Sequence, residues 1–107
     1  MISTHILDTT LGRPASDVAV SLFYQNQLIA QAKTNADGRI SATDFGLTAL
    51  QQGEYHLEFA TQAYFDRLST STFFPKAVIY FQIDQLDSHY HIPLLISAFA
   101  YSTYRGS

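Results

Sequence analysis

The sequence predicts an all-β protein, a sandwich of two antiparallel sheets with one short helix. Apolar and polar side chains alternate strictly over Glu54–Phe59, which places Tyr55, Leu57 and Phe59 on one buried face. The tetrapeptide Asn35–Gly38 combines Asn, Asp and Gly and is a strong turn signal. Segments of both kinds recur at regular spacing and give about seven or eight short strands, which is typical of a sandwich.

The first half of the chain is expected to contain short strands joined by turns, including one hairpin. In chain order we expect an extended stretch at Ser3–Asp8, a loop with Gly12 and Pro14, a strand at Val18–Tyr24, a turn at Gln25–Gln27 and a returning strand at Leu28–Thr34. The segments Ile40–Thr43 and Thr48–Leu50 are short and weakly patterned. We therefore expect a loop there, with room for one edge strand.

The apolar period changes to that of a helix over Thr61–Leu68. Tyr64, Phe65 and Leu68 fall on one helical face, and Thr61 is placed to cap the first turn, so a two-turn helix is expected. After a connection that ends at Phe73–Pro75, the remaining strands are expected at Ala77–Ile83, His89–Ile96 and Tyr101–Arg105.

Composition limits the class of protein and the kinds of partner. The 107 residues are expected to form a single domain, residues 1–107, which is long enough for its own core. Charged residues make up 14% of the chain, well below the usual quarter, which favours an oligomer that hides part of its surface. The net charge of -3 gives no electrostatic basis for binding nucleic acid or an anionic membrane.

The chain has no cysteine, so it forms no disulfide and does no thiolate chemistry. His5 and Asp8 interrupt the region where a signal peptide would need an apolar run, and no apolar run approaches the ~18 residues of a membrane span. These features favour a cytoplasmic protein without a membrane segment.

The late strands have two apolar faces, although a sandwich buries only one face of each sheet. In Val78–Ile83 both faces are largely apolar or aromatic, and the same holds for Tyr90–Ile96 apart from the histidines. A second subunit is expected to cover the extra face. The histidine face would then lie at a subunit junction, where small-molecule sites often form.

His89 and His91 are two residues apart, so on a strand both point to one face of the sheet. The spacing also suits zinc, with Asp8 and His5 as further ligands, but a zinc site needs three or four protein ligands and no cysteine is present. We therefore predict no metal site. His91 is then either a partly buried structural histidine or an acid–base group.

The other candidates also have an ordinary interpretation beside a functional one. By itself the sequence favours an exposed terminal residue for His5, a solvated loop arginine for Arg39, and a solvent-exposed residue for His56. Tyr104–Ser107 is either a frayed end or a tail tucked into a site. The second interpretation is supported by its aromatic ring, guanidinium, flexible glycine and ionised terminal carboxylate.

Four segments together resemble a known family. Tyr90–Ser97 followed by Tyr104–Ser107, with His5–Asp8 and Gly12–Ala15 at the start, is similar to the transthyretin-like enzymes that hydrolyse 5-hydroxyisourate. The resemblance spans nearly the whole chain, and the terminal Tyr-Arg-Gly-Ser is its most specific part, because the hormone-carrying transthyretins lack it. Ala98–Ala100 departs from the proline and glycine usual in the family, which bears on the shape of that loop and on the placing of the tail.

The resemblance implies a transthyretin-like sandwich and a homotetramer with sites in a channel where dimers meet. It implies hydrolysis of 5-hydroxyisourate to 2-oxo-4-hydroxy-4-carboxy-5-ureidoimidazoline in urate degradation, without metal or organic cofactor. The catalytic residues it implies are His5, Arg39, His91 and Ser107, and the substrate-binding residues are His5, Arg39, Tyr104 and Arg105. The alternative is a non-enzymatic small-molecule carrier of the transthyretin type, and a third class is an adhesion or carbohydrate-binding sandwich.

The chemistry of such a reaction fits these residue types. Water is a poor nucleophile at neutral pH, so a neutral imidazole must take its proton as it attacks the ring carbonyl. His5 or His91 is that base, and the sequence does not decide between them. The developing oxyanion needs hydrogen-bond donors, for which Arg39 and Arg105 are available.

Overall fold

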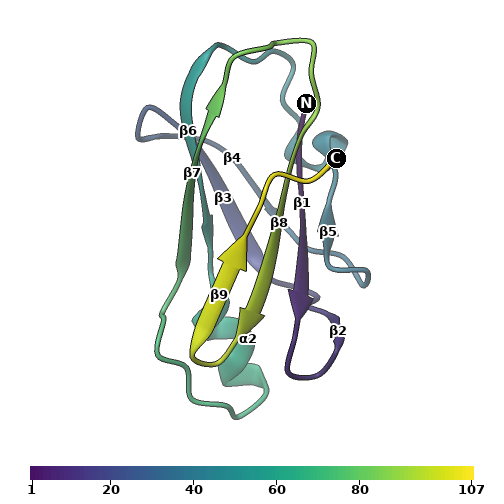
Figure 1. The fold of residues 1–107 in the computed structure, drawn as a ribbon, viewed down its shortest axis with the longest axis vertical. Helices are drawn as coiled ribbons and strands as arrows, with labels where there is room; N and C mark the ends of the chain where they lie inside the picture. The colour runs from purple at the N-terminus through teal and green to yellow at the C-terminus, as the bar shows by residue number, and fades with distance from the viewer.

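The computed structural model describes the whole chain, residues 1–107, as two sheets packed face to face (Figure 1). One sheet, the site sheet, contains β1 (Ile2–Asp8), β2 (Arg13–Pro14), β5 (Arg39–Ile40), β8 (Tyr90–Ser97) and β9 (Ala100–Thr103). The second sheet contains β3 (Ala19–Tyr24), β4 (Gln27–Lys33), β6 (Gly53–Phe59) and β7 (Ala77–Ile83). The two helices are α1 (Ala42–Phe45) and α2 (Thr61–Arg67).

The core lies between the sheets and is filled by every second residue of the long strands. Tyr55, Leu57 and Phe59 of β6 are 2%, 0% and 0% exposed, which confirms the inward face predicted for that strand. From β8, Leu94 and Ile96 are buried against them in the same cluster of 19 residues. The outer face of β8 is therefore left to other contacts, among them those of the site.

The site sheet is not wholly antiparallel, which corrects the expectation of two antiparallel sheets. β1 and β8 pair in parallel, with Ser3 opposite His91 and His5 opposite Pro93. All other pairings in both sheets are antiparallel. The chain between β1 and β8 builds the second sheet before it returns, so β8 enters beside β1 from the same end.

The single expected helix is present as α2, but two of its details were wrong. Ala60 is the residue at the N-cap and makes no side-chain capping bond, whereas Thr61 is already helical and buried. Tyr64 and Phe65 are buried as predicted, while Leu68 is 37% exposed. The helix ends before Leu68 and turns it toward solvent.

A second, one-turn helix, α1, lies where a loop was expected. Ser41 and Asp44 form a reciprocal capping box, and Gly46 ends the turn in the left-handed conformation. The sequence carried this signal, because Ser followed three residues later by an acid and then by Gly is a start and stop pattern for a helix. Weak apolar patterning hid it.

His56 is buried, not solvent-exposed as expected. It lies on the outer face of β6, but its ring is stacked on Phe23 and packs at a tilt against Tyr80, at centroid distances of 4.4 and 4.6 Å. Only 6% of its surface is exposed. Alternation placed the residue on the correct face, and cross-strand aromatic neighbours then covered it.

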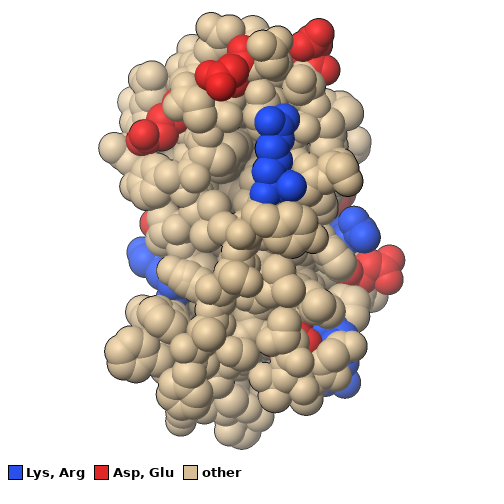
Figure 2. All heavy atoms as spheres, in the orientation of Figure 1, with Lys and Arg blue, Asp and Glu red and all other residues tan.

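Charged groups are sparse over the face of the molecule seen in Figure 2, where acidic side chains gather at the upper end. This view agrees with the low fraction of charged residues, 14% of the chain. Neither helix is long and apolar enough to cross a membrane.

Candidate active site

Four polar residues meet on the outer face of the site sheet: Ser3, His5, Arg39 and His91. The sequence predicted all of them except Ser3 as site residues. Ser3 and His5 alternate with the inward-facing Ile2, Thr4 and Ile6 of β1, and His91 occupies the neighbouring outer position of β8. Ser3 is paired with His91, and on the other side of β1 His5 is paired with Arg39 of β5. Parallel pairing of the first and the penultimate long strand thus brings residues from both ends of the chain onto one surface.

A pocket of about 570 Å³ opens beside this surface, toward α1 and the chain termini. It is lined by Arg39, His91 and Ser107, three of the four predicted catalytic residues. Ser3 and His89 line it as well, and Thr43 and Asp44 of α1 form its far wall. Such a volume suits a small organic ligand.

His5 is on the same face as this pocket but does not line it. Its pKa is lowered from the ordinary value, mainly by burial and also by the charge of Arg39. A hydrogen bond with the backbone of Asp37 and the charge of that residue act in the opposite direction. His5 is therefore held in its neutral form next to the arginine of β5.

His91 is half-buried and fixed by Ser3. The serine Oγ lies 2.8 Å from Nδ1 of His91, and no hydrogen bond within the chain involves Nε2. Burial lowers the pKa of His91, and the charge of Arg39 lowers it further, followed by those of His89 and His5. A neutral imidazole that lines the pocket can accept a proton at Nε2 at neutral pH when its own proton is on Nδ1.

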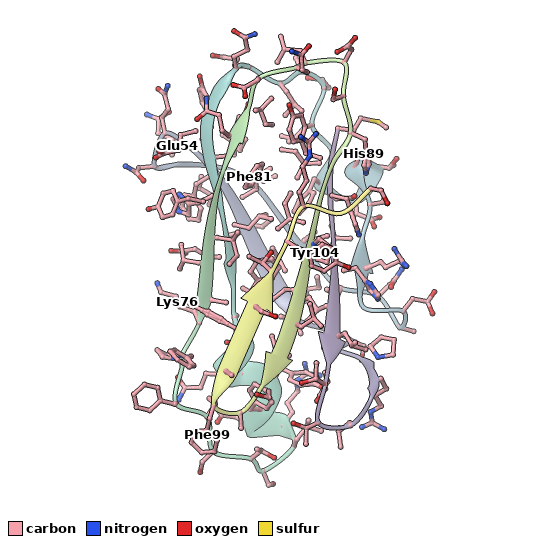
Figure 3. The ribbon with its side chains drawn as sticks, in the orientation of Figure 1. Glu54, Lys76, Phe81, His89, Phe99 and Tyr104 are labelled. Carbon is pink, nitrogen blue, oxygen red and sulfur yellow. The ribbon has the colours of Figure 1, made fainter.

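The C-terminal tail crosses β8 after β9 ends at Thr103, and Figure 3 shows Tyr104 where this crossing begins. The Gly106 nitrogen donates to the carbonyl oxygen of His91 at 2.8 Å. A Cβ on Gly106 would lie 2.6 Å from Cδ2 of His91, so the tail passes closer to the ring than any other residue type allows. This contact places Ser107 at the pocket.

Tyr104 and Arg105 do not line this pocket in the isolated chain. Both line a second cleft of about 290 Å³ between β7 and the start of β8, together with Tyr90 and His91. The Arg105 guanidinium lies over the Tyr90 ring, 4.5 Å from its centroid, and Tyr104 is 61% exposed. His91 therefore lines both cavities, whereas Arg39 and Ser107 line only the first and Tyr104 and Arg105 only the second.

The residues considered as metal ligands do not gather at one point. Asp8 points into the core, where it accepts a hydrogen bond of 2.7 Å from the Tyr64 hydroxyl. His, Asp and Glu side chains nowhere form a group of three or more with the spacing of a metal site.

The sequence interpretation missed Ser3. Its Oγ is 2.8 Å from Nε2 of His89 as well as from Nδ1 of His91, so one hydroxyl joins the two histidines. Alternation alone could have placed Ser3 on the face of His5, since the two are separated by one residue. Its proximity to His91 depended on the parallel register of β1 and β8, which the sequence does not reveal.

The model of the HIUase/Transthyretin family matches residues 2–106. The chain belongs to this family. Both the fold and the family expected from the sequence are thereby confirmed.

Family members with different functions are similar to the chain to different degrees. A probable 5-hydroxyisourate hydrolase from Schizosaccharomyces pombe is 41% identical over 99% of this chain and 90% of its own length. The structure of the Klebsiella pneumoniae 5-hydroxyisourate hydrolase superposes with a TM-score of 0.90 and 42% identity, covering 99% and 98% of the two chains. Sea bream transthyretin, solved with thyroxine, has a TM-score of 0.85 and 28% identity over 98% and 93%.

Proposed function

We propose that the protein is a 5-hydroxyisourate hydrolase of urate degradation. Water adds to a ring carbonyl carbon of the substrate, the adjacent ring C–N bond breaks, and 2-oxo-4-hydroxy-4-carboxy-5-ureidoimidazoline is formed. Support comes from the hydrolase relatives, whose identity to this chain, 41% and 42%, exceeds the 28% of the transthyretin.

The observation that carries the proposal is the pocket itself. A neutral histidine, an arginine and the terminal carboxylate of Ser107 face one small cavity on the outer face of the site sheet. A binding protein needs complementary groups only, whereas a hydrolase needs a base for water and a donor for the oxyanion. His91 and Arg39 provide this pair.

We assign the roles from the geometry. His91 Nε2 takes the proton of the attacking water and later returns it to the departing ring nitrogen, so the proton is conserved over the cycle. Arg39, which is exposed and aimed at the pocket, stabilises the oxyanion and binds the planar, oxygen-rich edge of the substrate. His5, which was expected to contact the substrate, does not line the pocket, and we propose that it acts through Arg39, its partner across β1 and β5.

The C-terminal residues Ser107, Tyr104 and Arg105 do not all line the pocket. The Ser107 carboxylate lines the pocket and can orient the water or polarise His91. Tyr104 and Arg105 were expected to bind the substrate ring and add a cation. In the isolated chain they line the second cleft, which His91 also lines, and we propose that a second subunit closes the two cavities into one channel.

The test is to add freshly generated 5-hydroxyisourate and to follow the loss of its ultraviolet absorbance against the spontaneous decay. We expect the wild type to accelerate the decay and His91→Asn to lower the rate about 10²- to 10⁴-fold, the usual value of positioned acid–base catalysis. The same substitution on the second sheet, His56→Asn, is the control and should leave the rate unchanged below its melting temperature. A wild type without effect on the decay would favour the small-molecule carrier.

We also propose a homotetramer with the sites in a channel between dimers, and a cytoplasmic location. The support for assembly is the low charge and the polar pocket left open on the outer face of the site sheet. The location rests on composition, and cell fractionation tests it.

A further inference from the structure

The Ser3 hydroxyl is the only direct link between two histidines of the pocket. It lies 2.8 Å from Nε2 of His89 and 2.8 Å from Nδ1 of His91, while the two rings are 6.3 Å apart. Ser3 is 9% exposed, whereas His89 is exposed just before β8 begins. It lies near the end of the molecule where the termini lie (Figures 1 and 3). The serine is therefore a fixed bridge between an outer and an inner imidazole.

The backbone holds this bridge in place independently of the side chains. The Tyr90 nitrogen donates to the Met1 carbonyl at 2.7 Å, and the Met1 amino group donates to the Ser88 carbonyl at 3.1 Å. These bonds hold the residues before β8 beside β1 and keep Ser3 opposite His91. The three side chains are thus brought together by strand pairing.

A serine hydroxyl carries one proton, so it cannot donate to both histidines. If it donates to His91 Nδ1, then His91 holds its own proton on Nε2 and has no lone pair toward the pocket. If it donates to His89 Nε2 instead, it accepts from His91 Nδ1–H, and His91 Nε2 is free to act as a base. An unprotonated His89 Nε2 takes the hydroxyl proton and so favours the second arrangement, whereas a donating group at that position leaves the hydroxyl proton available to His91 Nδ1.

We propose that Ser3 and His89 are positioning residues that hold His91 in the tautomer with its proton on Nδ1. This inference rests on the proposed function only for its effect on rate. His89 acts as the hydrogen-bond acceptor at the outer end, and Ser3 transmits that constraint to the base. Nothing else in the chain bonds to His91 Nδ1, so without Ser3 the tautomer is unconstrained.

Substitutions at His89 test the direction of the bridge. A carboxylate only accepts hydrogen bonds and an ammonium only donates them. His89→Glu should keep the His91 proton on Nδ1, and His89→Lys should move it to Nε2. Nitrogen-15 shifts of labelled His91 report the tautomer without any substrate, so this result stands even if the wild type does not hydrolyse 5-hydroxyisourate. The same tautomer in both variants would overturn the proposal.

Kinetics of Ser3 variants test the bridge itself. Ser3→Ala should lower kcat about ten- to a hundredfold with KM nearly unchanged. The reason is that His91 is no longer held in the required tautomer but keeps its position. Ser3→Thr, which keeps the hydroxyl, should recover most of the rate, and Ser97→Ala on the outer face of β8 is the matched control. If Ser3→Ala folds and has the wild-type kcat and tautomer, Ser3 does not control the tautomer of His91. If Ser3→Ala fails to fold, the nitrogen-15 shifts of the two His89 variants test the proposal instead.

Discussion

Gly106 is the residue on which the geometry of the tail depends. Its nitrogen bonds to the backbone of β8, and the absence of a side chain lets the tail pass over the His91 ring and Pro93. Its φ is not positive, so the need for glycine here is steric and not conformational. A methyl group would have no space without moving either the ring or the tail.

We therefore expect Gly106→Ala to lower the hydrolysis rate at least tenfold with little change in melting temperature. The added Cβ would lie 2.6 Å from His91 Cδ2 and 3.1 Å from Pro93 Cγ, so the base or Ser107 must shift. Gly12→Ala is the opposite control: it has open space but a φ of 68°, so it should cost about 1 kcal/mol of stability and leave the rate intact. Equal rates for the two variants would show that the tail is not part of the site.

The pH dependence of the rate should depend on Arg39. Burial and the Arg39 charge lower the pKa of His91 below its ordinary 6.5, so the neutral base persists below that pH and is lost only as the pH falls through the lowered value. Arg39→Met removes a positive charge, so the pKa of His91 rises and the acidic limb moves to higher pH. Proton NMR titration of His91 measures the shift directly. Arg13→Met, away from the pocket, should leave it unchanged, and an unmoved His91 titration in Arg39→Met would contradict this account.

At the scale of residues, the sequence predicted the site residues that are recognisable by their side-chain chemistry. It did not predict those whose role depends on the register between strands. His91, Arg39 and Ser107 were predicted as site residues and do line one pocket. Ser3 was missed because its role needs β8 beside β1, and His56 was misjudged because Phe23 and Tyr80 cover it from adjacent strands. Both errors concern neighbours across strands, which no local pattern encodes.

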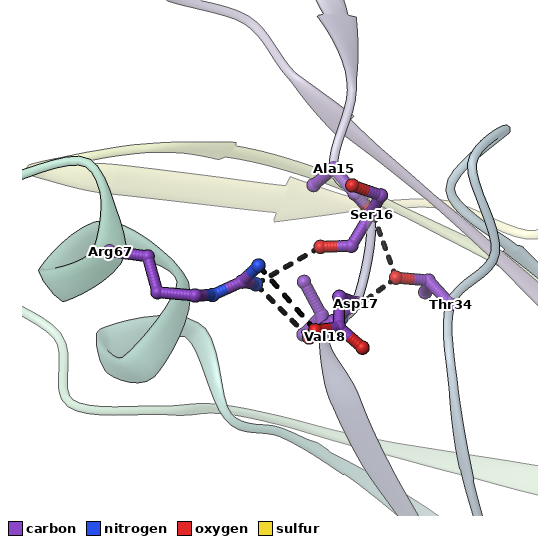
Figure 4. Close-up of polar contacts among 6 residues, drawn as sticks. All are labelled: Ala15, Ser16, Asp17, Val18, Thr34 and Arg67. Atoms are coloured by element: carbon purple, nitrogen blue, oxygen red, sulfur yellow. Dashed lines mark hydrogen bonds and ion pairs between the residues drawn. The ribbon is translucent and has the colours of Figure 1, made fainter.

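Among the elements, α2 is tied to the sandwich at two points. Its last residue, Arg67, donates to the carbonyl oxygens of Ser16 and Asp17 at 3.0 Å each, and its guanidinium lies 3.7 Å from the Asp17 carboxylate (Figure 4). Deeper in, the Tyr64 hydroxyl bonds to Asp8 at the end of β1. The helix therefore closes the end of the sandwich opposite the pocket.

The buried Tyr64–Asp8 bond should dominate the stability of this end. Tyr64→Phe leaves a carboxylate that is 1% exposed without one of its donors, which should cost about 1–3 kcal/mol in chemical denaturation at pH 8. Burial, and then the bond and charge of Asp8, raise the pKa of Tyr64 to about 12 from 10.0. That contribution is complete below pH 10 and is lost between pH 10 and 12, so the wild type should lose stability there more steeply than Tyr64→Phe.

Either of two results would contradict a stabilising role for the Tyr64–Asp8 hydrogen bond. One is a Tyr64→Phe variant that matches the wild type at pH 8, and the other is an alkaline slope that is identical in the two proteins. The control is Tyr104→Phe, which removes a hydroxyl from an exposed ring and should change neither measurement.

The elements themselves were largely predictable because their signals are local. Strict alternation found β6, and apolar spacing found α2. α1 was missed because four residues give almost no period, although its capping box is explicit in the sequence. The parallel pairing of β1 with β8 was also missed, because alternation fixes the faces of a strand and not its partner or direction.

At the scale of the whole molecule, two edge strands, β7 and the shorter β9, lie at the same side of the sandwich. β9 ends the site sheet and β7 ends the second sheet, so both carry unpaired backbone groups. Phe73 and Phe99, near these edges, are 72% and 70% exposed. We expect light scattering to give a mass near four times the 12.0 kDa of one chain. A 12.0 kDa particle at micromolar concentration would contradict the tetramer.

The pairing of β1 with β8 also determines when during synthesis the pocket can exist. The bond from Ser3 to His91 joins residues 88 positions apart, and that from Thr4 to the Ile92 carbonyl spans the same separation. Contacts between such distant positions form late, because closing a long loop costs entropy before any contact offsets it. A nascent chain can assemble the hairpin of β3 and β4 early, but β1 must wait without its partner until β8 leaves the ribosome. The protein therefore brings Ser3, His91 and Ser107 together in the last step of folding.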